Sequence, residues 1–137
     1  MRSLLLVDDD PEDLAALATL LINAGYETVA AQNAREALHY LTSRNPEPVA
    51  IVTDLSMPDM SGREFISILQ AYVRLSLIPI VVTGVETPAL DGIPTLKKPV
   101  AGDELIATLK RCIEKRVAGL GYKLNAADLL PPQSLPD

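Results

Sequence analysis

The sequence predicts an α/β fold in which helices cover both faces of a parallel β-sheet. Short, continuously apolar runs alternate along the chain with longer segments of helical period, a pattern typical of buried strands joined by helices. The 137 residues fall within the length of one domain and suffice to bury a core. We therefore expect one globular domain at residues 1–118 and a C-terminal tail, 119–137, that is too short to be an output domain.

Five segments of the chain are expected to form strands. The runs 4–7, 49–52 and 80–82 are apolar without polar alternation, as expected for central strands that are buried on both faces. The segments 26–31 and 93–96 have weaker patterns, which suit strands at the edges of the sheet.

Capping signals mark where the first three helices begin. Asp10 can cap the first helix with Pro11 at its first position, and Gly25 suits the left-handed turn that ends it. Two further pairs have the spacing of a capping box and place the second and third helices, Asn33 with Glu36 and Ser61 with Glu64.

The last helix is indicated by its period. Its apolar positions recur at 3.6-residue spacing, at Leu105, Leu109, Cys112, Ile113 and Val117. Before it, only residues 84–94 connect the last two strands, whereas a crossover with a helix needs at least about 10–12 residues. We therefore expect the fourth helix to be missing or reduced to a turn near 87–90.

The composition excludes several classes of function. A net charge of −6 without a basic stripe argues against a nucleic-acid groove, because clustered Lys and Arg drive binding to phosphate backbones. The apolar run 4–7 is cut off by aspartates and is too short for a signal peptide or a membrane span, so a cytoplasmic protein without membrane contact is expected. The single cysteine, Cys112, cannot form an internal disulfide and suits a small, partly buried apolar position.

Acidic side chains gather where two of the predicted strands end. Five of the six residues from 8 to 13 are acidic, and Asp54 ends another buried strand. Because loops at the carboxyl ends of parallel strands line the ligand crevice, these carboxylates should meet, and a hard cation such as Mg²⁺ would relieve their repulsion. Thr83 ends the fourth strand and Lys98 follows the fifth. They offer a hydroxyl and an ammonium, which a transferred phosphoryl group needs. Asp54 would then be the nucleophile that forms an acyl phosphate.

Four segments, in this order and spacing, resemble the response-regulator receiver family of two-component signalling. They are Leu-Val-Asp-Asp at 6–9, Asp-Leu-Ser-Met-Pro-Asp-Met-Ser-Gly at 54–62, Val-Val-Thr-Gly at 81–84 and Leu-Lys-Lys-Pro at 96–99. Each is weak alone, but together they span most of residues 3–118. The resemblance implies a flavodoxin-like, doubly wound sheet of five strands in the order 2-1-3-4-5.

The resemblance also implies a set of metal ligands. Asp9 would bind Mg²⁺ directly and Asp8 mainly through water, while Ser56 would lend its backbone carbonyl and Asp54 would be both ligand and phosphoacceptor. Asp10 could take one place in this set, but its position before Pro11 suits a helix cap, so the pair at 8 and 9 is preferred.

The phosphoryl group would be held by residues on the other strands. The resemblance assigns its oxygens to the hydroxyl of Thr83, to the backbone amides of Leu55 and Gly84, and to the ammonium of Lys98. Without a phosphoryl group, this ammonium would pair with the acceptor aspartate. Pro99 would follow a cis peptide bond.

Other polar residues receive simpler interpretations. Lys97 competes with Lys98 for the site, but side chains alternate across a strand and the family pairs lysine directly with proline, so Lys97 is expected to be a solvated charge. His39 is expected on the surface without a role as phosphate donor or ligand. Tyr72 is expected to pack on the third helix.

Two departures from the family pattern keep a second interpretation open. Thr95 stands where the family usually has an aromatic residue whose rotation reports phosphorylation, and the fourth crossover is short. These features favour a binding scaffold that signals without phosphorylation. A metal-dependent hydrolase is disfavoured because no second catalytic base can be named, so the only expected catalysis is the protein's own phosphorylation and dephosphorylation.

The resemblance implies partners as well. The phosphoryl group would come from a histidine kinase or a histidine phosphotransfer protein, and the product would bind an unknown downstream protein, with a homodimer also open. A missing fourth helix would leave apolar side chains around Ile68, Leu75 and Ile106 under-covered. We therefore expect the tail, 119–137, to fold back over this face or to clasp a second subunit.

Overall fold

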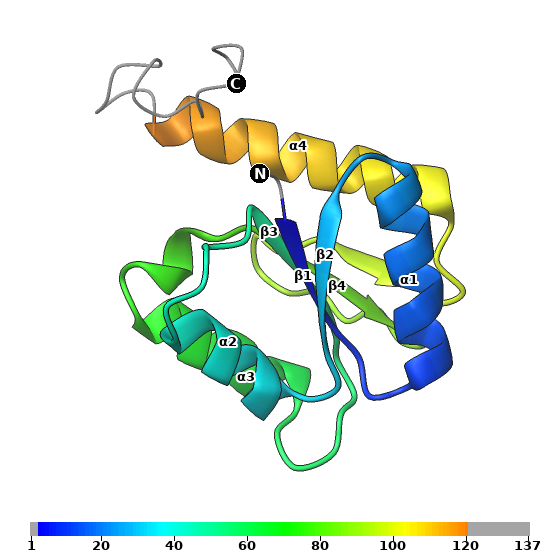
Figure 1. Ribbon diagram of the computed structural model, residues 1–137, viewed down its shortest axis with the longest axis horizontal. Coiled ribbons are helices and arrows are strands. Elements are labelled where there is room, and N and C mark those ends of the chain that lie inside the picture. Colours follow the sequence, from blue (N-terminus) through cyan, green and yellow to red (C-terminus); the bar gives the residue numbers. More distant parts are fainter. Residues whose placement is uncertain (1–2, 121–137) are drawn as a thin grey trace.

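The computed structural model describes the backbone of residues 3–120 and the side chains of residues 3–118, and its centre is a parallel sheet (Figure 1). The strands are β1 Ser3–Val7, β2 Glu27–Ala31, β3 Ala50–Asp54, β4 Ile80–Gly84 and β5 Thr95–Lys97. They lie in the order β2-β1-β3-β4-β5, and every neighbouring pair is parallel. The predicted flavodoxin-like order is confirmed.

Each central strand contributes to two hydrophobic cores, because successive side chains of a strand point to opposite faces. In β1, Leu4 and Leu6 join one core, while Leu5 and Val7 join the other. All residues of β1, β3 and β4 are buried, which explains why these strands lack polar alternation. The edge strands β2 and β5 are partly exposed, as their weaker patterns predicted.

Helices cover both faces of the sheet (Figure 1). The helices α1 Pro11–Asn23 and α4 Gly102–Leu120 pack on one face, and α2 Ala34–Thr42 and α3 Gly62–Ala71 pack on the other. No helix in the described part of the chain is long and apolar enough to cross a membrane.

The start of α1 follows the predicted capping signals. The Asp10 carboxylate accepts hydrogen bonds from the backbone amides of Glu12 and Asp13, and Pro11 is the first helical residue. Just beyond the other end of α1, Gly25 has a φ of 99°, which glycine adopts without the steric cost that a Cβ would bring. The Asp10 cap fixes the first turn of α1 beside the carboxyl ends of the strands.

The second and third helices are capped in two different ways. Ser61 and Glu64 form a reciprocal capping box at the start of α3. Asn33 accepts a hydrogen bond from the Glu36 amide, but the Glu36 carboxylate accepts from the amide of Gln32. The predicted cap of α2 is therefore present without the reciprocal bond of a complete box.

Residues 85–94 connect β4 to β5 without a helix, which confirms that the fourth helix of the family pattern is missing. An antiparallel bridge between Leu90 and Ile93 closes a turn over Asp91 and Gly92. Gly92 has a φ of 72°, a conformation that glycine adopts readily. The turn therefore lies at 91–92 and not at 87–90.

The apolar side chains that the missing fourth helix was expected to leave under-covered are more buried than expected. Leu75 lies in a short 3₁₀ helix, η1 Leu75–Leu77, and is only 2% exposed, while Ile68 and Ile106 are half-buried. The expectation of an under-covered Leu75 is wrong because η1 turns it into the core. Tyr72 does not pack as expected either, since it follows the last residue of α3 and is 55% exposed.

The last helix extends further than the predicted domain boundary. α4 runs through Leu120, so residues 119 and 120, expected to be irregular, are helical. Residues 121–137, and with them the expected folding-back of the tail, lie outside the described part of the chain.

Candidate functional site

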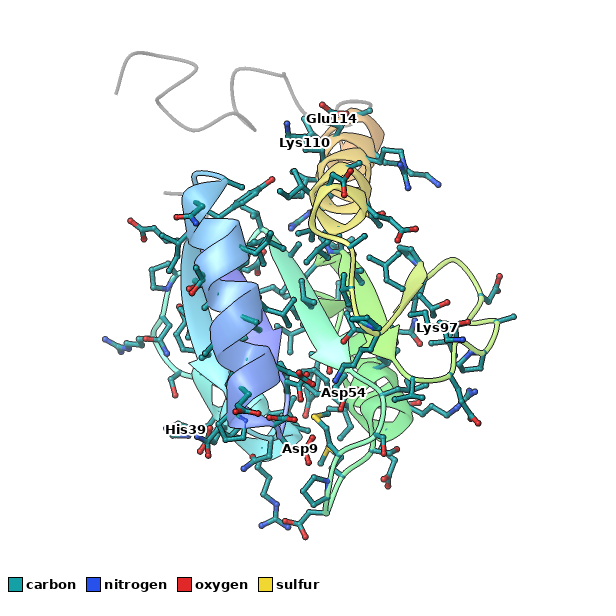
Figure 2. The ribbon with its side chains drawn as sticks, turned by 90° about the vertical axis from the view of Figure 1, so that its right-hand side faces the viewer. Asp9, His39, Asp54, Lys97, Lys110 and Glu114 are labelled. Carbon is teal, nitrogen blue, oxygen red and sulfur yellow. The ribbon has the colours of Figure 1, made fainter. Side chains whose placement is uncertain are left out.

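The carboxyl ends of four strands bring the predicted site residues together. Asp8 follows β1, Asp54 ends β3, and Lys98 follows β5. Thr83 on β4 lies opposite Asp54 in the register of the sheet. Asp8, Asp54 and Lys98 line a pocket of about 740 Å³, and Asp9 lies at the same end of the sheet as Asp54 (Figure 2).

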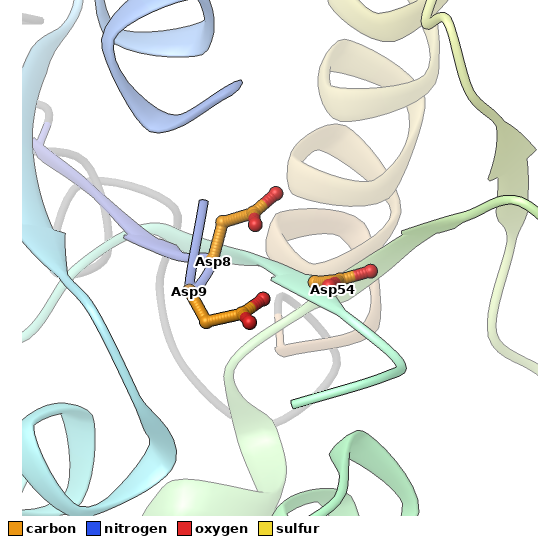
Figure 3. A group of neighbouring side chains, drawn as sticks. All are labelled: Asp8, Asp9 and Asp54. Carbon is orange, nitrogen blue, oxygen red and sulfur yellow. The ribbon is translucent and has the colours of Figure 1, made fainter. Parts of the chain in front are cut away.

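Three carboxylates of this pocket lie close enough to share one cation. A carboxylate oxygen from each of Asp8, Asp9 and Asp54 lies within 4.8 Å of the others, and Figure 3 shows these three side chains as one group. Asp8 and Asp54 are buried and Asp9 is exposed, so the group is open to solvent on one side. Such a set of hard oxygen ligands fits Mg²⁺, which prefers a few carboxylates together with water.

Lys98 lies among three carboxylates. Its ammonium donates hydrogen bonds to Asp8 Oδ2 at 2.9 Å and to Asp13 Oδ2 at 3.1 Å, while Asp54 Oδ1 lies 3.5 Å away. The expected pairing with Asp54 is therefore present, but Asp54 is the most distant of the three. Burial alone would lower the pKa of Lys98, but the hydrogen bonds to Asp8 and Asp13 outweigh it and raise that pKa above its usual value.

Burial dominates the environment of Asp54. Desolvation raises the pKa of its carboxyl group, and the opposing effects of Lys98 and of the Leu55 amide do not cancel it. The Leu55 amide lies 2.9 Å from Asp54 Oδ1 and 3.2 Å from the carbonyl oxygen of Thr83. Ionising Asp54 therefore costs free energy in the folded protein, and a cation or an acyl bond at this carboxylate would reduce that cost.

Thr83 carries a hydroxyl without a partner. Its side chain is buried, and no described residue hydrogen-bonds to its Oγ1. A buried hydroxyl that makes no hydrogen bond destabilises the protein. Since Thr83 is the register partner of Asp54, this hydroxyl is free to donate to a group bound at the carboxylate.

The remaining predicted positions are also located. Ser56 lies in the loop after β3 and lines the pocket, where its carbonyl stays a predicted ligand. Asp10 caps α1 and is not part of the carboxylate group. Lys97 and His39 are exposed and lie away from Asp54 (Figure 2). The Lys98–Pro99 peptide bond is cis, as predicted.

A family model settles what kind of domain this geometry belongs to. The model of the response regulator receiver domain matches residues 4–110. The chain belongs to this receiver domain family.

Curated relatives of the receiver are regulators from bacteria and plants. It is 28% identical over 126 residues to the transcriptional regulatory protein KdpE of Mycobacterium tuberculosis, covering 86% of this chain and 54% of that protein. It is 30% identical over 136 residues to the response regulator Rre1 of Synechocystis, covering 93% of this chain and 58% of that protein. The chain therefore spans little more than half the length of these regulators.

Solved structures share the fold of the receiver. A sensor protein from Polaromonas superimposes with a TM-score of 0.77 at 27% identity, covering 84% of this chain and 98% of that one. The chemotaxis protein CheY4 of Vibrio cholerae gives a TM-score of 0.74 at 29% identity, covering 82% and 98%. The described chain therefore has the fold of these solved proteins along most of its length.

Sequence reasoning missed one residue of the receiver site. Asp13 was counted in the acidic run but was not expected to contact Lys98. The signal that could have found it is its position in the first turn of α1, because helical side chains lean toward the N-terminus of their helix. That lean brings Asp13 to the strand ends.

A second missed feature is the reason for glycine at position 62. A Cβ there would lie 2.6 Å from the carbonyl oxygen of Asp54 and 2.7 Å from the Cα of Leu55. In the sequence, Gly62 is recognisable only as the last residue of the segment at 54–62 that resembles the family. Its packing role depends on the path of the loop between Asp54 and α3, which can be seen only in the three-dimensional structure.

Proposed function

We propose that this receiver accepts a phosphoryl group on Asp54, with Mg²⁺ held by Asp8, Asp9, Asp54 and the backbone carbonyl of Ser56. The observation that carries the proposal is the convergence around one strand-end carboxylate of two further carboxylates, an ammonium and a free hydroxyl. These are the groups that positioning and charge stabilisation of a phosphoryl group require.

The transfer follows from the roles that these groups can take. An oxygen of the Asp54 carboxylate attacks the phosphorus of a phosphohistidine on a histidine kinase or a phosphotransfer protein, and the imidazole nitrogen keeps the electron pair of the broken P–N bond. Bound Mg²⁺ would neutralise the charge of the carboxylates and of the phosphoryl oxygens. Lys98 and Thr83 donate to the phosphoryl oxygens, aided by the amides of Leu55 and Gly84.

Dephosphorylation restores the starting state. Water attacks the phosphorus, the Asp54 carboxylate keeps the electron pair of the broken P–O bond, and inorganic phosphate leaves while a proton passes to solvent. The two states differ in charge at the ends of the strands, and a downstream protein that prefers one state reads the signal.

Intact-mass measurement after incubation with Mg²⁺ and a small phosphodonor tests the proposal. The wild-type protein should gain the mass of one phosphoryl group, and Asp54→Asn should gain none, because the amide is not a nucleophile for this transfer. A full gain in Asp54→Asn would move the acceptor elsewhere.

The same measurement addresses the second candidate function. Thr95 at the position of the usual aromatic residue and the connection without a helix at 85–94 favour a scaffold that binds its partner without phosphorylation. A wild-type protein that binds Mg²⁺ but gains no phosphoryl mass would support that scaffold.

A further inference from the structure

The contacts of Lys98 are of two kinds. Asp8 and Asp54 belong to the carboxylate group that fits a cation, whereas Asp13, which hydrogen-bonds the same ammonium at 3.1 Å, lies outside that group. A bound cation would share Asp8 and Asp54 with Lys98 and leave Asp13 to Lys98 alone.

A cation at the carboxylate group would weaken the attraction that holds Lys98 in the site. A divalent ion bound to Asp8 and Asp54 reduces the attraction that these carboxylates exert on Lys98, and the ion itself repels the ammonium. The Lys98 side chain is 19% exposed, so it already contacts solvent and is not enclosed by the pocket. The metal-bound site therefore needs a separate anchor if the ammonium is to stay near Asp54.

Asp13 is placed to be that anchor. It lies in the first turn of α1, where its backbone amide donates to the Asp10 carboxylate and Pro11 fixes the start of the helix. Its own side chain is 45% exposed, so its carboxylate costs little desolvation. The anchor thus belongs to helix α1, whereas the proposed metal ligands lie in the loop before α1, at the end of β3 and in the loop after β3.

We propose that Asp13 is a positioning residue for Lys98, which keeps the ammonium beside Asp54 while the cation is bound. A phosphoryl group arriving on Asp54 then meets a donor that is already in place. This inference rests on the proposed phosphoacceptor site, although Asp13 binds neither the cation nor the phosphoryl group.

The first test follows Lys98 in the unphosphorylated protein. An amine-acylating reagent is applied with and without Mg²⁺, and the labelling of Lys98 is measured by peptide mass spectrometry in wild type, Asp13→Asn and Glu12→Gln. Glu12 is the matched control, because it lies in the same turn and is exposed. Mg²⁺ should raise the labelling at least about threefold in Asp13→Asn and should leave it low in the other two proteins.

Calorimetric titration with Mg²⁺ alone separates the two ways in which this test can fail. Absence of Mg²⁺ binding in the wild type would refute the proposed metal site. Binding together with equal labelling in Asp13→Asn and Glu12→Gln would refute the role of Asp13.

The second test asks whether Asp13 acts through Lys98. With Mg²⁺ and a small phosphodonor, Asp13→Asn should slow phosphorylation of Asp54 at least about threefold, and Glu12→Gln should not. In a Lys98→Ala background, Asp13→Asn should cause no further slowing, because there is no ammonium left to position. Equal slowing in both backgrounds would overturn the proposal.

Discussion

The buried carboxylate of Asp54, the proposed phosphoacceptor, lowers the stability of the folded protein when it is ionised. Asp54 is 6% exposed and its pKa is raised by burial, so its ionised form is less favourable in the folded protein than in the unfolded chain. Lys98 offsets only part of this cost, because its closer hydrogen bonds are to Asp8 and Asp13. A functional group is thus held where it does not stabilise the fold.

This burial predicts a pH-dependent effect of Asp54→Asn on stability in Mg²⁺-free buffer. Because the folded-state pKa lies above the ordinary value of 3.8, the wild type loses stability as pH rises through that window. Asp54→Asn should therefore be more stable than wild type at neutral pH, and the difference should shrink as pH falls toward 4. Thermal melting followed by circular dichroism at several pH values measures it.

Asp59→Asn is the control for this prediction. Asp59 is exposed and has a φ of 68°, a conformation that asparagine also adopts. Its substitution should change stability little at any pH. A wild type that is more stable than Asp54→Asn at neutral pH would show that Lys98 outweighs the desolvation of Asp54.

The positions of the site residues follow from the sequence, but the contacts of their side chains do not. The site residues could be located because each lies at the carboxyl end of a strand or just after it, and the carboxyl ends of parallel strands meet at one edge of the sheet. These residues are the acidic pair, Asp54, Thr83 and Lys98. The sharing of Lys98 among three carboxylates could not, because ion-pair partners depend on side-chain distances of 2.9–3.5 Å. Strand order alone does not fix such distances.

At the scale of elements, the contact between α3 and the end of β3 controls the shape of the site. The Gly62 amide donates to the Leu55 carbonyl at 2.8 Å, and the absence of a Cβ lets α3 begin directly against the backbone of Asp54 and Leu55. The start of α3 therefore packs directly on the backbone that carries the Asp54 carboxylate.

Gly62→Ala should disturb both stability and phosphorylation. Its Cβ would meet backbone atoms at 2.6 and 2.7 Å, and backbone can yield only if β3 or α3 moves. We expect a loss of about 1–3 kcal/mol in the free energy of unfolding, measured in urea, and slower phosphorylation of Asp54.

Gly102→Ala provides the matched comparison. Its Cβ would also approach another atom at 2.6 Å, but that atom is the end of the flexible Leu20 side chain, which can rotate away. This variant should lose much less stability and should be phosphorylated normally. Equal losses in both glycine variants would show that the backbone contact at Gly62 is not decisive.

Elements differed in how well the sequence predicted them. The central strands could be predicted because strands buried on both faces lack polar residues. The helices α1, α2 and α3 could be predicted because their capping residues lie next to them in the sequence. η1 was missed, since its three residues, Leu75–Leu77, are too few to show a period. The chain turns at 91–92 and not at the predicted 87–90, because Gly92 adopts a φ of 72° and closes the turn there.

At the scale of the molecule, the two ends of the sheet are held together differently. At the end opposite the site, Glu47 precedes β3 and pairs with Arg74 after α3 at 3.1 Å and with Arg116 of α4 at 3.2 Å. These opposite charges link elements from both faces of the sheet. At the site end, by contrast, Asp8, Asp9, Asp13 and Asp54 line one pocket together with Lys98 and Arg63, and Lys98 contacts three of these four carboxylates.

The excess of negative charge at one end predicts that Mg²⁺ stabilises the folded protein as a whole. Binding to the native carboxylate group relieves a repulsion that the unfolded chain hardly feels. A Mg²⁺ concentration about ten times the dissociation constant would add about 1.4 kcal/mol to the free energy of unfolding, seen as a rise in melting temperature. Asp9→Asn should remove most of that rise, because Asp9 is a member of the group.

Asp10→Asn is the control, since Asp10 carries the neighbouring negative charge outside the group and asparagine caps a helix as well as aspartate does. A rise that survives in Asp9→Asn but disappears in Asp10→Asn would place the cation one residue further along the chain.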